Sequence, residues 1–424
     1  VFGEATQYGE QWFSVSDGKK FPNTKIKWET TLTRNVALDI SLFGDRLTIT
    51  PEFYWTTTKD LLYESVIPST MGFTKQMQNI GQVTNKGIEL SINGDILRGK
   101  DYVLSANFTF GMNKMKIDKL NDTDDILWIL DDRWKPDYDN YCLRVGDQVG
   151  LIYGFVYDGL YSPDEFYFDP TQNFLAVPNE GTVINTIYQD SNSGAATLPG
   201  KIKFKDLDGS GAIDGGKGTA DDHGDLKVIG NSLPRYEYSF HLGGSWKGID
   251  LDLFFQGVGK RSDWTIASLN FPMMRSADLA VYEHQSSYNR VFYSDDWKAI
   301  TGYDINQGNT YPRLYPGNEA KGTVSGIANG SNNYYPQSRY LTDMSYLRLK
   351  NVTVGYTLPK EWTRKAFIEK ARIYFSGSNL FLLYKGSDLP VDPEISTGDG
   401  LTSAGWGRTA PITRTFSFGI QVTL

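Results

Sequence analysis

Hydrophobic and polar residues alternate one by one through much of this chain, the pattern of β-strands that have one apolar and one polar face. Ile249, Leu251 and Leu253, for example, are separated by Asp250 and Asp252. A strand of about 9–11 residues crosses a bilayer at the tilt found in barrels. A soluble β-sandwich also alternates, so the pattern alone leaves both possibilities open. The sequence predicts nine strands, near residues 38–42, 46–55, 88–93, 102–113, 236–242, 249–256, 346–357, 372–378 and 412–424.

The lengths of the connections between these strands separate the two possibilities. Outer-membrane barrels have short periplasmic turns and long extracellular loops, whereas loops longer than ~15 residues are uncommon in soluble domains. Here short connections at about 44–45, 95–100, 247–248 and 358–370 alternate strictly with long ones at about 59–81, 114–235, 259–345 and 380–411. We therefore expect an all-β fold, a transmembrane antiparallel β-barrel located in the outer membrane, with extracellular long loops and a periplasmic carboxyl terminus.

The same pattern divides the chain into parts. We expect the remnant of an extracellular loop at 1–25, barrel strands at 26–114, a long extracellular excursion at 115–235, and carboxyl-terminal barrel strands at 236–424 with extracellular loops at about 259–345 and 380–411. Closure of such a barrel requires an even number of strands, so nine strands imply that others precede Val1. The helix-like composition of 358–370 predicts a short cap on the periplasmic rim, with a membrane anchor or a partner-binding helix as alternatives.

Composition argues against several functional classes. The net charge of −8 and the pI near 5.1 argue against a nucleic-acid-binding surface. The single cysteine, Cys142, and the three scattered histidines give little support to a zinc site or to Cys/His catalysis. We therefore expect no catalytic residues and no enzymatic activity. No run of about 18 apolar residues is present, so no transmembrane helix is predicted.

An Asp-rich loop at 206–214 is the clearest candidate for a metal site. Oxygen ligands at alternate positions, with a glycine where the chain turns sharply, are typical of calcium loops. Position twelve of this loop is Lys217, which excludes an EF-hand. The alternatives are a bound structural Ca²⁺ or a metal-free loop held by Asx turns. The candidate ligands are Asp206, Asp208, Ser210, the carbonyl of Ala212, and Asp214.

An acidic, aromatic run at 122–141 is the candidate for substrate binding. Trp134 and Tyr138 could stack on sugar rings, since aromatic faces bind apolar faces of ligands. The same rings could instead pack the loop against itself or against a partner protein. Asp131 and Asp132 offer neighbouring carboxylates, but adjacent residues point apart, so glycoside hydrolysis is not expected.

Several motifs follow one another in order along nearly the whole chain. They are Trp28-Glu-Thr30, Phe43-Gly-Asp-Arg-Leu47, Asn79-Ile-Gly-Gln-Val-Thr-Asn-Lys-Gly-Ile-Glu-Leu90, Gly159-Leu-Tyr-Ser162, Val228-Ile-Gly-Asn231, Tyr346-Leu-Arg-Leu-Lys-Asn351, Gly355-Tyr-Thr-Leu-Pro359 and Ser376-Gly-Ser-Asn-Leu-Phe381. In this order, the chain resembles the carboxyl-terminal part of the SusC-like TonB-dependent outer-membrane transporters of Bacteroidetes, the SusC/RagA family.

The resemblance implies the carboxyl-terminal strands of a barrel of ~22 strands with a plug inside, the plug and earlier strands being absent. It implies an importer of oligosaccharides or peptides that is surrounded by outer-membrane lipid. The implied partners are a SusD-like surface lipoprotein as a lid and the TonB complex, which would act through the absent amino-terminal part. A calcium-dependent all-β adhesin or carbohydrate-binding module is the alternative, and its apolar stripes would be buried between two sheets.

The resemblance also implies one more metal ligand. In the family pattern an Asp precedes the Val-Ile-Gly motif, and here that residue is Asp225. A Gly- and Asp-rich insertion at 215–224 displaces it from the first ligands, and Asp221 or Asp222 could take its place.

Overall fold

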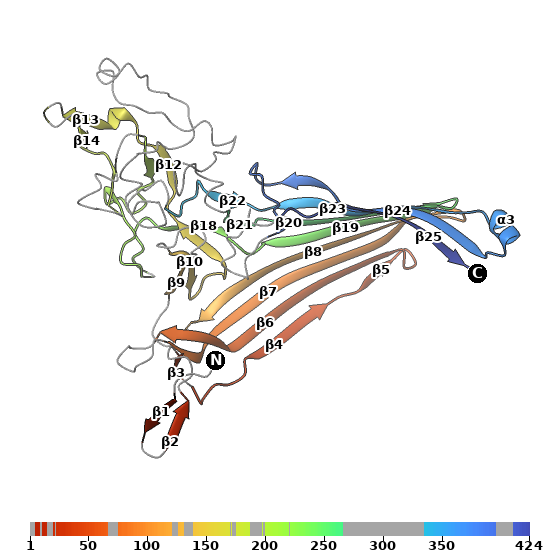
Figure 1. Ribbon diagram of the computed structural model, residues 1–424, viewed down its shortest axis with the longest axis horizontal. Coiled ribbons are helices and arrows are strands. Elements are labelled where there is room, and N and C mark those ends of the chain that lie inside the picture. The colour runs from red at the N-terminus through yellow and green to blue at the C-terminus, as the bar shows by residue number, and fades with distance from the viewer. Residues whose placement is uncertain are drawn as a thin grey trace. The chain divides into compact units, whose positions relative to one another are not determined.

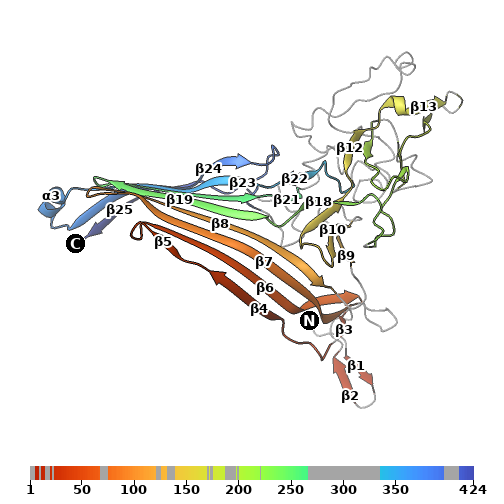
Figure 2. The same ribbon diagram turned by 180° about the vertical axis from the view of Figure 1, so that it is seen from behind.

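In the computed structural model, strands predominate among the described residues (Figure 1, Figure 2), and the described helices are short. It has two compact units, Val1–Asn93 with Thr109–Leu127 and Leu143–Val149, and Gly94–Phe108 with Trp128–Cys142 and Gly150–Leu424. The structure describes residues 5–8, 11–14, 20–21, 23–66, 75–120, 126–130, 139–169, 171, 175–186, 197, 200–219, 221–265, 335–395 and 410–424.

The first unit is built on long antiparallel strands in the order β8-β7-β6-β4. Two of them, β7 and β8, continue into the second unit, because the division falls within them. A hairpin of β1 and β2 precedes the sheet, and β3 pairs in parallel with β7. The strands are β1 (Ala5–Tyr8), β2 (Gln11–Ser14), β3 (Lys20–Phe21), β4 (Thr30–Ala37), β5 (Ile40–Leu42), β6 (Leu47–Val66), β7 (Lys75–Arg98) and β8 (Tyr102–Lys119).

A proline explains why the edge row of this sheet is split into β4 and β5. Both strands pair with β6, and the break between them lies opposite Pro51. Proline has no backbone N–H to donate to a ladder, so it is tolerated where pairing is interrupted. Leu38 still donates its N–H to the Pro51 carbonyl at 3.1 Å, which keeps the row in register across the break.

The second unit contains the strand order β8-β19-β20-β23-β24-β25, in which the neighbours from β19 to β25 pair antiparallel. Lys247 and Gly248 both have positive φ, which is the turn geometry that suits a two-residue hairpin. The strands are β19 (Tyr236–Trp246), β20 (Ile249–Gly259), β23 (Tyr346–Thr357), β24 (Lys370–Lys385) and β25 (Thr415–Thr423); α3 (Lys360–Thr363) and the 3₁₀ turn η6 (Arg364–Ala366) connect β23 to β24.

The strands of the second unit have one apolar and one polar face, and the apolar face is exposed. On β25, Phe418 is 71% exposed and Ile420 is 63% exposed. These apolar rows continue across neighbouring strands, because Phe375 pairs with Phe418 and with Val354. Large contiguous apolar surfaces mark contact with a partner or a membrane. Among the described residues, no helix is long and apolar enough to cross a membrane.

The two long segments at 115–235 and 259–345, which the sequence predicts to be loops, include folded parts that share one hydrophobic core. We call the described residues within 139–142, 150–232, 261–265 and 335–345 the loop module. Phe155 forms a parallel bridge with Gln337, and Trp264 is fully buried. The core consists of Tyr141, Ile152, Phe155, Ile202, Phe204, Ile213, Trp264, Tyr335 and Tyr340.

Short strands and small sheets surround this core. They are β9 (Ile126–Leu130), β10 (Asp139–Arg144), β11 (Leu151–Gly154), β12 (Tyr157–Leu160), β13 (Phe166–Asp169), β14 (Leu175–Pro178), β15 (Ile184–Asn185), β16 (Ile202–Phe204), β17 (Ala212–Ile213), β18 (Lys227–Asn231), β21 (Ser262–Trp264) and β22 (Leu341–Asp343), with a 3₁₀ turn η2 (Pro163–Glu165).

Several strands are longer than the sequence predicts. The predicted loop at 59–81 is largely strand, because β6 continues to Val66 and β7 begins at Lys75. Likewise β8 continues to Lys119, and β24 extends to Lys385 into the segment predicted as a loop at 380–411. The extensions of β6 and β7 are mostly polar, and the extension of β24 is a continuous apolar run from Leu380 to Tyr384, so neither kind carries a period-2 signal. The extension of β8 does alternate, with Met115 and Ile117 between polar residues.

Candidate functional site

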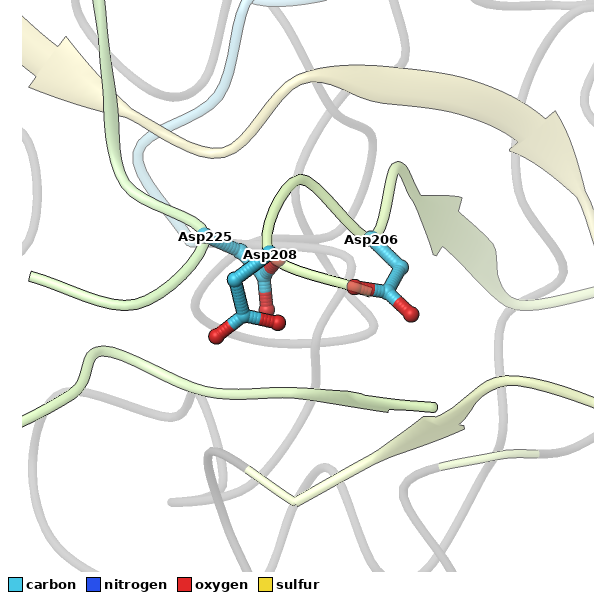
Figure 3. A group of neighbouring side chains, drawn as sticks. All are labelled: Asp206, Asp208 and Asp225. Carbon is cyan, nitrogen blue, oxygen red and sulfur yellow. The ribbon is translucent and has the colours of Figure 1, made fainter. Parts of the chain in front are cut away.

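Three carboxylates from two separate stretches meet in the loop module. Asp206 and Asp208 follow β16, and Asp225 precedes β18; one oxygen from each lies within 4.8 Å of the others. Figure 3 shows the three side chains gathered around one small space. The sequence predicts each of them as a metal ligand, and the structure brings these three together across the insertion at 215–224.

Backbone N–H groups hold the first two carboxylates in place. Asp206 accepts hydrogen bonds from the N–H groups of Gly209 and Gly211, at 2.7 and 2.9 Å. Asp208 accepts one from the N–H of Ser210 at 2.9 Å, and this bond lowers the pKa of the Asp208 carboxyl. Gly209 and Gly211 both have positive φ, a conformation that glycine adopts without strain. The loop therefore winds around the Asp206 carboxylate.

Asp225 is the buried member of the group. Its carboxylate accepts the N–H of Leu207 at 2.6 Å and the N–H of Asp214 at 3.0 Å, so it joins both stretches of the loop. Burial raises the pKa of Asp225, and the charges of Asp208 and Asp206 raise it further, against the effect of those two hydrogen bonds. A cation placed among the three carboxylates would offset this repulsion.

The remaining predicted ligands have other contacts. The Ser210 hydroxyl donates to the Ala212 carbonyl at 2.8 Å, so both atoms are engaged with each other. The Asp214 carboxylate accepts the N–H of Gly216 at 2.7 Å, and Asp214 is outside the group of three. Asp222 forms an ion pair with Lys217 at 3.2 Å. Asp225, rather than Asp221 or Asp222, thus completes the carboxylate group.

The donor set suits a hard cation such as Ca²⁺. All three groups offer carboxylate oxygens, and an oxygen that accepts one N–H keeps a second lone pair for a metal. The loop is also anchored, because Ile213 on β17 is fully buried in the core of the module. Asp206, Asp208 and Asp225 would hold such an ion and supply three negative charges.

The two predicted substrate-binding residues, Trp134 and Tyr138, lie outside the described residues, as do Asp131 and Asp132. Many side chains in the described part of the 115–235 segment are buried in the core of the loop module. Tyr141 is buried and donates its hydroxyl to Asp263 at 2.8 Å, which links the segments before and after the β19–β20 hairpin. Cys142, the next residue, is buried as well.

A polar depression on the β19–β24 sheet was not singled out from the sequence. Its volume is about 510 Å³, and charged groups on three strands line it. His241 lies 2.5 Å from Asp252, and the Arg372 side chain hydrogen-bonds Asp250 with both its Nε and a terminal nitrogen. Side-chain alternation in the sequence placed His241, Asp250 and Asp252 on the polar face of their strands. That Arg372 lies next to Asp250 depends on the registers of β20, β23 and β24, which the sequence does not reveal.

Gly355 makes the Arg372–Asp250 contact possible. It lies on β23, between β20 and β24, directly opposite Asp250 and Tyr374. A side chain there would collide at 2.5 Å with both the Arg372 guanidinium and the Asp250 carboxylate. The missing side chain therefore lets an ion pair form across an intervening strand.

The comparisons with known proteins agree with this architecture. Residues 3–144 match the family described as "TonB dependent receptor-like, beta-barrel". TonB-dependent receptor P3 of Formosa agariphila is 31% identical over 95% of the chain. Over nearly its whole length the chain is homologous to TonB-dependent receptors. The predicted all-β transmembrane barrel fold is thereby confirmed, and β19, β20, β23, β24 and β25 are part of the wall of that barrel.

The relatives of this receptor chain confirm the SusC-like resemblance. SusC of Bacteroides thetaiotaomicron is 25% identical over 94% of the chain. The RagAB peptide transporter has the same fold, with a TM-score of 0.64 over 99% of the chain at 21% identity. The chain spans 35% of the length of the P3 receptor and 33% of SusC. The strand number of the complete barrel and the presence of a plug stay predictions.

Proposed function

We propose that this receptor chain is part of the barrel wall of an outer-membrane importer for nutrients, with oligosaccharides or peptides as substrates. The observation that carries the proposal is the opposite character of the two faces of the sheet formed by β19, β20, β23, β24 and β25. Phe418 and Ile420 expose an apolar face suited to lipid, whereas Asp252 and Arg372 are on the face that carries the polar depression. A barrel wall between lipid and an aqueous lumen needs this arrangement.

The proposed orientation has extracellular long loops and a periplasmic carboxyl terminus. It is supported by the contrast between the two kinds of connection. Lys247 and Gly248 form a two-residue turn, whereas the segments that contribute to the loop module are long enough to share a core. In outer-membrane barrels the short turns are periplasmic.

The proposed partners are a SusD-like lipoprotein at the surface and the TonB complex. Support comes from the relatives: SusC and P3 are called TonB-dependent receptors, and RagAB is called a peptide transporter. A lid protein would contact the extracellular side, and the folded loop module offers it a pre-organised surface. TonB would act through a part of the receptor outside this chain.

We propose that Ca²⁺ has a structural role in this importer. The three carboxylates of Asp206, Asp208 and Asp225 bring the turn after β16 next to the start of β18. The chain then continues from β18 into β19, a strand of the large sheet. Neutralising their repulsion would stabilise the module on which the lid would rest. No reaction is assigned to the ion.

Deletion of the gene tests the proposed nutrient role. Growth of the deletion strain on a panel of polysaccharides and protein hydrolysates should fail on one class and recover when the gene is restored. Affinity purification of the receptor in detergent should recover a surface lipoprotein in equal amounts. Undiminished growth on every class, together with a receptor that purifies alone, would overturn the proposal.

The alternative function, a soluble calcium-dependent adhesin or carbohydrate-binding module, predicts apolar stripes that are buried between two sheets. The exposed rows at Phe416, Phe418 and Ile420 do not support that arrangement. Aggregation of the protein in the absence of detergent would separate the two functions, because an adhesin would remain monomeric in buffer.

A further inference from the structure

Three connections of the second unit meet at one end of its sheet. Lys247, in the β19–β20 turn, donates its N–H to the carbonyl of Asp101, in the β7–β8 turn, at 3.0 Å. Thr357, at the end of β23, donates its N–H to the carbonyl of Gly248 at 2.7 Å. The α3 segment follows Thr357 directly, and both views show it at this end of β23 and β24 (Figure 1, Figure 2).

This end carries large aromatic side chains that are open to the surroundings. Trp362 of α3 is 62% exposed and Phe367 is 93% exposed. Trp246, beside the β19–β20 turn, is 58% exposed, and Tyr102 at the start of β8 is 46% exposed. Trp and Tyr collect at membrane–water interfaces, where the ring lies among the headgroups. The four exposed rings at this end of the sheet therefore indicate a membrane–water interface.

The backbone holds the α3 segment firmly against the sheet. Leu358 donates its N–H to the Ala371 carbonyl at 2.9 Å, and Glu369 donates to the Thr423 carbonyl at 2.9 Å. Thr363, in the middle of the segment, is buried. Phe367 has a positive φ of 59° at the end of η6, where glycine is the usual residue. A strained position occupied by an exposed phenylalanine indicates that its ring has a use outside the fold.

The segment is cationic in an acidic protein. Residues 358–370 contain four cationic side chains and two carboxylates, a net charge of +2, whereas the whole chain has −8. Lys360, Arg364 and Lys365 are all exposed. Cationic side chains next to interfacial aromatic rings are the combination that binds anionic phospholipid headgroups.

We infer that the segment 358–370 is a lipid-binding foot: Trp362 and Phe367 enter the interfacial layer of the membrane, while Arg364 and Lys365 bind phosphate groups of anionic phospholipids. The surface continues the lipid-facing wall, because Ala371 and Ile373 pair with Val422 and Ile420 on the exposed apolar row. The inference rests on the proposed membrane function and orientation, in which this end meets the phospholipid leaflet on the periplasmic side.

Fluorescence quenching by brominated phospholipid tests where Trp362 lies. The intact receptor and its Trp362→Phe variant are reconstituted in nanodiscs of phosphatidylcholine and phosphatidylglycerol, with and without bromine near the headgroup end of the acyl chains. The difference between the two proteins isolates the emission of Trp362. We expect that emission to fall severalfold in brominated lipid. An unquenched Trp362 would overturn the inference.

Two other tryptophans make the outcome specific. Trp246 is on the exposed apolar row and should be quenched in the same nanodiscs, whereas Trp264 is fully buried in the loop module and should not. If Trp246 is quenched and Trp362 is not, the barrel is in the membrane, and only the inference that the segment 358–370 binds lipid is contradicted. If neither is quenched, the proposed membrane function itself has failed.

Lipid retention tests the charged part of the foot. The double variant Arg364→Gln with Lys365→Gln should lower the ratio of retained phosphatidylglycerol to phosphatidylcholine by about fivefold per charge, as measured by native mass spectrometry. Replacing Lys205, an exposed residue of the loop module, with Gln is the matched control and should change nothing. Equal ratios for the parent and the double variant would contradict headgroup binding.

Discussion

Tyrosine rings lie across glycines of neighbouring strands at several points of the wall. Tyr238 faces Gly257, Tyr236 faces Gly259, and in each case the ring occupies the space of the missing side chain. The Tyr374 ring on β24 covers Gly419 on β25 in the same way, three strands further along the sheet. A glycine inside a strand normally weakens it, so these positions require a packing reason, and the covering ring supplies one.

Substitution of one covered glycine tests this packing. Gly257→Ala should destabilise the barrel by about 1–3 kcal/mol, because the added methyl forces the Tyr238 ring out of its place. Gly111→Ala is the matched control, since Gly111 is also inside a strand but has open space where its side chain would be. Denaturation in detergent micelles measures both. Equal midpoints for the two variants would show that the rings do not confine these glycines.

The carboxylate group of the loop module predicts calcium binding at the residue scale. Asp208→Asn should weaken Ca²⁺ binding by roughly tenfold or more, because affinity in such sites follows the number of ligand charges. Asp221→Asn removes an exposed acid of the same insertion that is outside the group and should have little effect. Isothermal titration calorimetry with Ca²⁺ compares the two. Equal affinities would contradict the assigned ligands.

Burial of Asp225 gives the same site a pH dependence. Its raised pKa in the calcium-free fold means that stability falls as pH rises from the ordinary carboxyl pKa to the raised one. The lowered pKa of Asp208 has the opposite sign: its contribution is present at neutral pH and is lost as pH falls. Ca²⁺ requires both groups ionised, so protection of the module from proteolysis by Ca²⁺ should be large at neutral pH and small in mild acid. Equal protection at both would contradict the site.

At the scale of elements, buried ion pairs hold the chain that follows β24. Arg348 on β23 is buried, and it contacts Asp392 at 2.6 Å and Glu394 at 2.9 Å. Lys350 pairs with Glu394 as well. Removing one partner of a buried pair leaves the other charge uncompensated, which is costly.

Arg348→Met should therefore loosen the segment 386–395 by about 2–3 kcal/mol, less than for fully buried pairs because the carboxylates are partly accessible. Hydrogen exchange of this segment measures the effect. Arg98→Gln serves as the control, since Arg98 is largely exposed and reaches Asp95 only at 3.4 Å. Unchanged exchange in the Arg348 variant would show that the ion pairs do not hold the segment.

Much of the strand pattern could be predicted from sequence, because side-chain alternation reports the two faces of a wall directly. The nine predicted strands correspond to β5, β6, β7, β8, β19, β20, β23, β24 and β25, whereas β4, in the same row as β5, was not predicted. The loop module could not be predicted, because Phe155 and Gln337 come together only after a long intervening segment has folded back. No local pattern carries such a pairing.

The candidate site was predictable only in part, for the same reason. The spacing of Asp206 and Asp208 is a local signal, whereas Asp225 was found through a family resemblance. The Arg372–Asp250 pair depends on the register of three strands and on the missing side chain of Gly355. Side-chain alternation placed Asp250 on a polar face, but it could not identify Arg372 as the partner of Asp250.

At the scale of the whole molecule, we propose that this chain is part of the wall of a TonB-dependent importer. Its apolar rows would face lipid, its polar depression would face the lumen, and its loop module would carry the lid. The chain has 35% of the length of the P3 receptor that it matches, so the transport cycle belongs to the intact receptor.

Uptake of a labelled substrate by intact cells tests this claim most directly. The substrate is taken from the class on which the deletion strain fails to grow. Cells that have the receptor and TonB should accumulate it, and accumulation should stop when the gene is deleted, when TonB is removed, or when a protonophore collapses the membrane potential. Accumulation that continues without TonB and without the potential would contradict the account.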